Sequence, residues 1–112
     1  MAKLGEFDVR RRELPGKGTV LQVEGELDMA TAPALEEALA DAGFDERLVI
    51  DLTACTFIDS SAVRVLVSSA RDSEAARGSL ALVVTDPGIL RVLEISGVDT
   101  MLPVHETLAA AL

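Results

Sequence analysis

The sequence predicts an α/β fold, in which a small, open, mixed β-sheet of four or five strands carries packed helices. Short apolar runs of strand length alternate with segments whose apolar residues recur at helical spacing. Strands that alternate with helices pair in parallel through right-handed crossovers, whereas an apparent hairpin at the start adds an antiparallel pair. At 112 residues the chain is long enough to bury a core, so one domain is expected over residues 1–112.

The first two strands are predicted to form the hairpin. Phe7 and Val9 alternate with polar neighbours, residues 15–18 (PGKG) are typical of a turn, and residues 20–23 follow as the second strand. Gly25 is expected to end that strand.

A helix is predicted next. Its apolar residues fall on one helical face: Leu35, Ala38, Leu39 and Ala42. Thr31 or Asp28 can cap its start, Pro33 fits its first turn, and Gly43 fits its C-terminal cap.

Residues 48–52 and 80–84 are short, nearly continuous apolar runs, which favours buried parallel strands. Between them, a helix is expected to begin after residues 59–61. Its predicted apolar face consists of Val63, Leu66, Val67 and Ala70.

The last third predicts one more helix, a weak edge strand and a helical tail. Asp86 and Pro87 have the residue types of an N-cap and a first helical position, and Gly97 ends that helix. Its apolar face includes Leu90 and Leu93. Residues 101–104 contain a proline and suit an edge strand, and residues 106–112 are rich in Ala and Leu.

Composition excludes several function classes. The formal net charge is −9, which disfavours direct binding to nucleic acid or to acidic membranes. The basic cluster at residues 10–12 is short and is interpreted as a solvated face. A single cysteine, no apolar run of membrane-spanning length and no secretory leader pattern favour a cytoplasmic protein.

The residues that usually carry catalysis are sparse. His105 is the one histidine, and Cys55 is the one cysteine and has no partner at zinc-ligand spacing. Neither a P-loop nor a dinucleotide-binding glycine motif occurs. We therefore expect no enzyme, with no catalytic residue, metal or cofactor.

One segment, residues 56–63, joins a buried strand to an amphipathic helix. Asp59 can cap that helix, which places Ser60 and Ser61 in the first turn, where backbone N–H groups are unpaired. This is a good helix start and needs no further role. It is equally a position where a phosphorylated hydroxyl would be tolerated without refolding.

Three segments together resemble the STAS family, and most closely its free-standing bacterial anti-sigma factor antagonists. They are GELD at residues 25–28 with Thr31, LVIDL at 48–52, and FIDSS at 57–61. The resemblance covers nearly the whole chain and implies a mixed sheet of four or five strands with helices mainly on one face.

The resemblance also implies a mechanism. The unphosphorylated protein would bind an anti-sigma factor of GHKL-type serine kinase fold and so release a sigma factor. The kinase would phosphorylate the first serine of the D-S-S motif, Ser60, and a PP2C-type phosphatase would reverse this. Modification of Ser61 or Thr56 stays open, and we expect a monomer.

Six further residues are expected to bind the partner: Asp28, Thr31, Asp59, Ser61, Ala62 and Arg64. The family commonly has D-S-S-G-L-G, so Ala62 and Arg64 replace glycines. Arg64 lies four residues after Ser60, where it could pair with a phosphate, contact an acidic partner surface, or be an ordinary solvated arginine.

Two other functions compete with the phosphorylation switch. In one, the domain is a constitutive accessory or scaffold subunit of a transport or signalling complex, and Ser60 is not modified. In the other, it binds a small ligand, although no glycine-rich phosphate cradle supports this.

Overall fold

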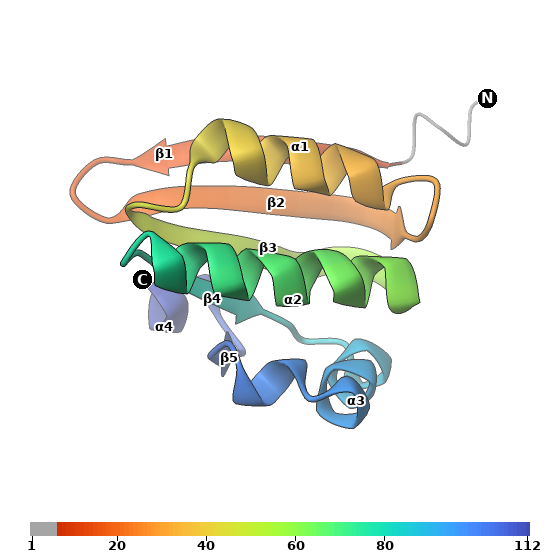
Figure 1. The fold of residues 1–112 in the computed structure, drawn as a ribbon. Helices are drawn as coiled ribbons and strands as arrows, with labels where there is room; N and C mark the ends of the chain where they lie inside the picture. Colours follow the sequence, from red (N-terminus) through yellow and green to blue (C-terminus); the bar gives the residue numbers. More distant parts are fainter. Residues whose placement is uncertain (1–6) are drawn as a thin grey trace.

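A computed structural model describes residues 7–112 and shows a mixed α/β fold (Figure 1). Its sheet has five strands, which agrees with the predicted four or five, and their order is β1-β2-β3-β4-β5. The strands are β1 (Asp8–Leu14), β2 (Gly18–Leu27), β3 (Arg47–Ile58), β4 (Ser79–Val83) and β5 (Val104–His105). The helices are α1 (Ala32–Ala42), α2 (Ser60–Ala75), α3 (Pro87–Ser96) and α4 (Leu108–Ala111), with a 3₁₀ turn over Val98–Thr100.

The strand directions are also those predicted. The β1–β2 hairpin is antiparallel, and β2, β3, β4 and β5 pair in parallel. The edge strand β5 begins later than residues 101–104 suggest, because Met101 lies in a turn and pairing starts with the Pro103 carbonyl, which accepts from Leu82 N at 2.9 Å. Proline can supply that acceptor but no donor, so regular pairing begins at Val104.

Helices α1 and α2 lie side by side on one face of the sheet (Figure 1). The main core forms there and includes the fully buried side chains of Leu35, Leu39, Ile50 and Leu66, together with Leu93 of α3. A smaller cluster on the opposite face is formed by three buried valines of β2, β3 and β4, which are Val20, Val49 and Val83. Leu108 and Ala111 of α4 pack against it. The helices therefore pack mainly on one face.

The caps of α1, α2 and α3 follow the predicted residue types in most places. Pro33 lies in the first turn of α1, and Gly43 follows its end with φ +82°. Asp86 caps α3 by accepting a hydrogen bond from Ile89 N, and Gly97 ends it in the left-handed conformation. The start of α3 at Asp86 follows the carboxyl end of β4, whereas Gly43 lies before the amino end of β3.

The buried face of α2 differs from the predicted one. The side chains that face the core are Ala62, Val65, Leu66, Ser69, Ala70 and Ser73. Val63 and Val67 are only half-buried at its margin. Two serines, Ser69 and Ser73, thus lie on the buried face, and the most apolar stripe of the helix is not its deepest one.

Strands β2 and β3 are longer than predicted, and Gly25 does not end β2. The pairing of β2 with β3 is interrupted by two bulges, and at each of them β3 carries one extra residue. Gly25, which has φ +97°, adjoins one of these bulges. At the other, Asp51 Oδ1 accepts a hydrogen bond from Thr53 N at 3.0 Å. The buried Asp51 carboxylate thus pairs with a bulge amide that leaves the ladder.

The bulge beside Gly25 changes which side chains reach the surface. Gly25 pairs with Cys55 and Glu26 pairs with Phe57, so Thr56 is the extra residue of β3. Strict alternation is lost there: Phe57 is 48% exposed, and Ile58, the last residue of β3, is buried. The bulge therefore turns an aromatic ring outward beside the start of α2.

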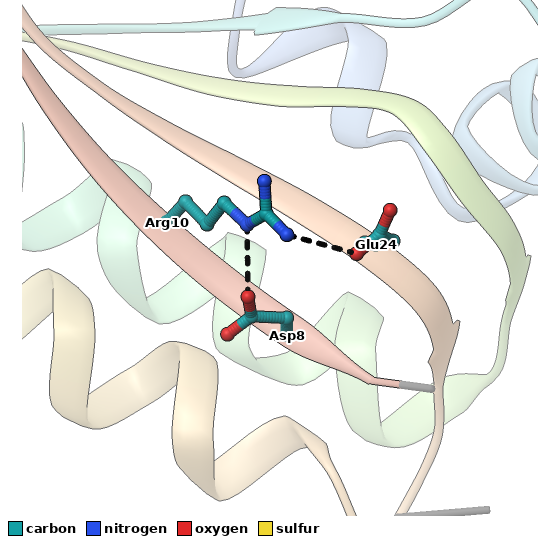
Figure 2. Close-up of polar contacts among 3 residues, drawn as sticks. All are labelled: Asp8, Arg10 and Glu24. Carbon is teal, nitrogen blue, oxygen red and sulfur yellow. Dashed lines mark hydrogen bonds and ion pairs between the residues drawn. The ribbon is translucent and has the colours of Figure 1, made fainter. Parts of the chain in front are cut away.

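The basic cluster of β1 forms ion pairs with acidic neighbours. Arg10 Nε contacts Asp8 Oδ2 at 3.0 Å, and Arg10 Nη2 lies 3.9 Å from Glu24 Oε1 (Figure 2). The Asp8 hydrogen bond, followed by the charge of Glu24, raises the pKa of Arg10. Arg11 pairs with Glu13 at 2.7 Å. These exposed pairs agree with the predicted solvated face.

Within residues 7–112, no helix is long and apolar enough to cross a membrane.

Candidate protein-binding site at the carboxyl edge of the sheet

The turns after β2 and β3 meet at one edge of the sheet. Leu27 and Ile58, the last residues of these parallel strands, are register partners. Asp59 N then donates a hydrogen bond to the Leu27 carbonyl at 3.3 Å. Asp28 and Asp59 follow these paired positions directly, so both predicted site carboxylates come to the same edge.

The turn before α1 is held by Asp28 and Thr31. Asp28 Oδ1 accepts hydrogen bonds from Ala30 N at 3.0 Å and Thr31 N at 3.2 Å. Thr31 Oγ1 accepts from Asp28 N at 2.9 Å and donates to the Glu26 carbonyl at 2.7 Å. Thr31 occupies the N-cap position, but its side chain makes no cap hydrogen bond. Its hydroxyl instead closes the turn, which fixes the shape of this surface.

Helix α2 begins as predicted. Asp59 Oδ1 accepts hydrogen bonds from Ser61 N at 2.8 Å and Ala62 N at 3.4 Å. Ser60 is the first helical residue and is exposed, whereas Ser61 is half-buried. Among the hydroxyls of the D-S-S motif, that of Ser60 is therefore the more accessible to another protein.

Two residues expected to bind a partner lie in different surroundings. Ala62 has no exposed surface and packs in the core, so its side chain is not accessible to a partner, and a part for Ala62 in partner binding stays a prediction. The side chain at this position faces the sheet because it lies on the buried stripe of α2. Arg64 is exposed on the outer side of the same helix.

Sequence reasoning missed two exposed apolar side chains at this edge. Met29, next to Asp28, is 78% exposed, and Phe57 is 48% exposed two residues before Asp59. Met29 follows β2 and Phe57 lies at the end of the neighbouring strand β3, so the turns at this edge carry exposed apolar surface as well as carboxylates. The bulge that exposes Phe57 leaves no sequence signal, but Met29 in a polar turn could have been noticed.

Cys55 and His105 lie in strands β3 and β5. Cys55 is buried, and its thiol donates to the Phe57 carbonyl with an Sγ–O distance of 3.3 Å. Burial raises the pKa of the Cys55 thiol, which keeps it protonated. His105 lies in β5 opposite Val83. Over residues 7–112, no group of three or more His, Cys, Asp or Glu side chains could hold a metal ion.

Comparison with known proteins agrees with this architecture. The STAS domain family matches residues 7–111. The anti-sigma-F factor antagonist RsfB of Mycobacterium tuberculosis is 35% identical over 97 residues, which cover 83% of this chain and 77% of RsfB. The crystal structure of an anti-sigma factor antagonist from Mycobacterium paratuberculosis has a TM-score of 0.85 at 32% identity, covering 94% of this chain and 90% of the other.

The same fold occurs in the anti-sigma factor antagonist SpoIIAA in its unphosphorylated form, with a TM-score of 0.76 at 21% identity over 92% of each chain. A structure of the phosphorylated form of SpoIIAA from Bacillus matches with a TM-score of 0.69 at 19% identity, covering 92% of this chain and 96% of the other. The match over residues 7–111 and these relatives establish that the chain belongs to the STAS domain family.

Proposed function

We propose that this protein is an anti-sigma factor antagonist that works by partner exchange as a single domain over residues 1–112. Unphosphorylated, it binds a cytoplasmic anti-sigma factor of GHKL-type serine kinase fold and so releases the sigma factor. Phosphorylation of Ser60 ends this binding, and a PP2C-type phosphatase restores it. The chain is a kinase substrate and a binding protein rather than an enzyme.

The observation that carries the proposal is the exposed hydroxyl of Ser60 in the first turn of an Asp59-capped helix. The positive end of the helix dipole and the free N–H groups of the first turn favour an added anion. A phosphate there needs no change in the core, because the side chain already points into solvent. The fold of SpoIIAA likewise exists in phosphorylated and unphosphorylated forms.

The surroundings of Ser60 suit a switchable contact. Exposed Met29 and Phe57 supply apolar surface, and the hydrogen-bonded turn of Asp28 and Thr31 keeps its shape before binding. A contact of standard size buries about 800 Å² on each partner. We propose that Ser60 lies inside such a contact, with Asp28, Asp59 and Ser61 beside it.

The chemistry follows from that placement. The kinase transfers the γ-phosphoryl group of ATP to Ser60 Oγ; a new O–P bond forms, the bond to ADP breaks, and a base of the kinase takes the hydroxyl proton. The product carries a charge of about −1.5 to −2 at pH 7. Burying that charge beside two aspartates in a contact costs desolvation and repulsion. A coupling of about 3 kcal/mol weakens binding roughly 150-fold.

A labelling experiment tests the site. The protein is incubated with its anti-sigma kinase and radiolabelled ATP, and Ser60→Ala is compared with two matched hydroxyl variants, Ser61→Ala and Thr56→Ala. We expect Ser60→Ala alone to lose labelling while it still binds the kinase. Labelling that survives in Ser60→Ala and disappears in either control contradicts the assignment.

The same experiment addresses the alternative of a constitutive scaffold subunit. A scaffold domain binds its partner with no labelling of wild type, and binding does not respond to ATP. That outcome rejects the phosphorylation switch and leaves the contact surface in place.

A further inference from the structure

The one basic residue in the first two turns of α2 is Arg64, one helical turn after Ser60. Side chains at positions i and i+4 are neighbours on a helix surface. Both side chains are exposed, so no packing keeps them apart. The guanidinium of Arg64 thus lies within reach of any group carried on Ser60 Oγ.

Arg64 is also uncommitted within the part of the chain that the structure describes. Arg10 and Arg11 form ion pairs with acidic side chains, and Arg47 donates to the Leu112 carbonyl at 2.7 Å. Arg64 takes part in none of the side-chain hydrogen bonds or ion pairs found over residues 7–112. Its guanidinium can therefore accept a new anionic partner without losing an old one.

The negative charge near Ser60 favours a cationic partner for a phosphate on this residue. Asp59 caps the same helix, and Asp28 lies at the same edge of the sheet. A phosphate on Ser60 adds a charge of about −1.5 to −2 to these two carboxylates. Guanidinium groups bind phosphate oxygens through two parallel hydrogen bonds, which suits an arginine better than a lysine for this role.

We propose that Arg64 is a phosphate clamp, which forms an ion pair with the phosphate of Ser60 in the modified protein. The inference rests on the proposed phosphorylation of Ser60 and adds its regulation. By pairing with the phosphate, Arg64 neutralises part of the added charge and sets how strongly phosphorylation weakens partner binding. In the unmodified protein its side chain stays in solvent.

The test uses protein with phosphoserine incorporated at position 60 during translation, so that no kinase is needed. Phosphorus NMR follows the second ionisation of the phosphate between pH 5 and 8. An arginine partner favours the dianion and lowers this pKa, so Arg64→Ala should raise it by about half a unit, a threefold change in proton affinity. Asp59 and Asp28 are common to all variants, and their effects cancel in the comparison.

Two variants serve as controls. Arg71→Ala removes an exposed arginine of the same helix that lies about 16 Å from Ser60 along the helix axis, and it should leave the phosphate pKa unchanged. Arg64→Lys keeps the charge but loses the paired hydrogen bonds, so it should give an intermediate value. The melting temperatures of the unphosphorylated proteins should agree, since neither arginine is packed.

A phosphate pKa in Arg64→Ala equal to that of wild type overturns the clamp. If the same variant instead binds the anti-sigma factor more weakly while unphosphorylated, Arg64 belongs to the partner contact. The comparison of phosphate pKa values does not depend on the proposed function, which fails separately if no kinase labels Ser60.

Discussion

Substitution of Asp59 separates its role in the fold from any role in the switch. In Asp59→Ala, the amide of Ser61 loses its acceptor at 2.8 Å, and the amide of Ala62 loses a weaker one at 3.4 Å. The backbone bond from Val63 N to the Asp59 carbonyl, at 3.1 Å, is retained. One good charge-assisted bond is therefore lost, and water replaces it in part because Ser61 is only half-buried.

The expected loss of stability for Asp59→Ala is about 1–1.5 kcal/mol, within the range of about 0.5–2 kcal/mol for removed N-caps. Unfolding entropy of about 2.1 cal/mol/K per residue converts this to a fall in Tm of about 4–6 °C for a chain of 112 residues. Asp59→Asn keeps an oxygen acceptor and should stay within about 0.5 kcal/mol of wild type.

Urea and thermal unfolding measure these differences, with binding to the anti-sigma factor as the second readout. If Asp59 is a cap only, Asp59→Asn binds and is labelled like wild type. If its charge also serves the contact or the kinase, Asp59→Asn folds normally but changes binding or labelling. Equal stability of Asp59→Ala and wild type would refute the capping argument.

Three further outcomes are expected. Gly78→Ala should lose about 2–3 kcal/mol or more in urea unfolding, because its Cβ would lie 1.9 Å from the Phe44 carbonyl oxygen. Asp51→Ala should lose about 1–2 kcal/mol in the same assay, because a bulge amide is left without its acceptor. The raised pKa of Cys55 predicts slow alkylation of the native protein at pH 8. It also predicts a contribution to the unfolding free energy that is present below the ordinary thiol pKa and is lost as pH rises through the raised pKa. Cys55→Ala should flatten that alkaline decline in unfolding free energy.

The order of elements and the direction of the strands could be predicted because the signals are local. Apolar runs, an early Pro33, the Asp86 cap and the glycines after α1 and α3 each act over a few residues. The features that could not be predicted from the sequence depend on tertiary packing. The bulges of β3 break strict alternation, and the core face of α2, which includes two serines, lies one position away from its most apolar stripe.

In the candidate site too, the features set by local sequence could be predicted and those set by tertiary packing could not. Ser60 and Asp59 were found from a helix start, which is a local pattern. The burial of Ala62, which the sequence places among the partner-binding residues, could not be predicted because the direction of its side chain depends on the rotation of α2. The exposure of Phe57 was missed because an aromatic residue at the end of an apolar strand is typical of a core, and only the bulge turns it outward.

The most direct test of the central claim is the affinity of the protein for its anti-sigma factor before and after modification of Ser60. Calorimetry would compare wild type with protein carrying phosphoserine at position 60, and phosphoserine at position 61 would serve as the matched control. Our account predicts binding that is weaker by roughly 100-fold or more for the form modified at Ser60. Equal affinities for unmodified and Ser60-phosphorylated protein would contradict it.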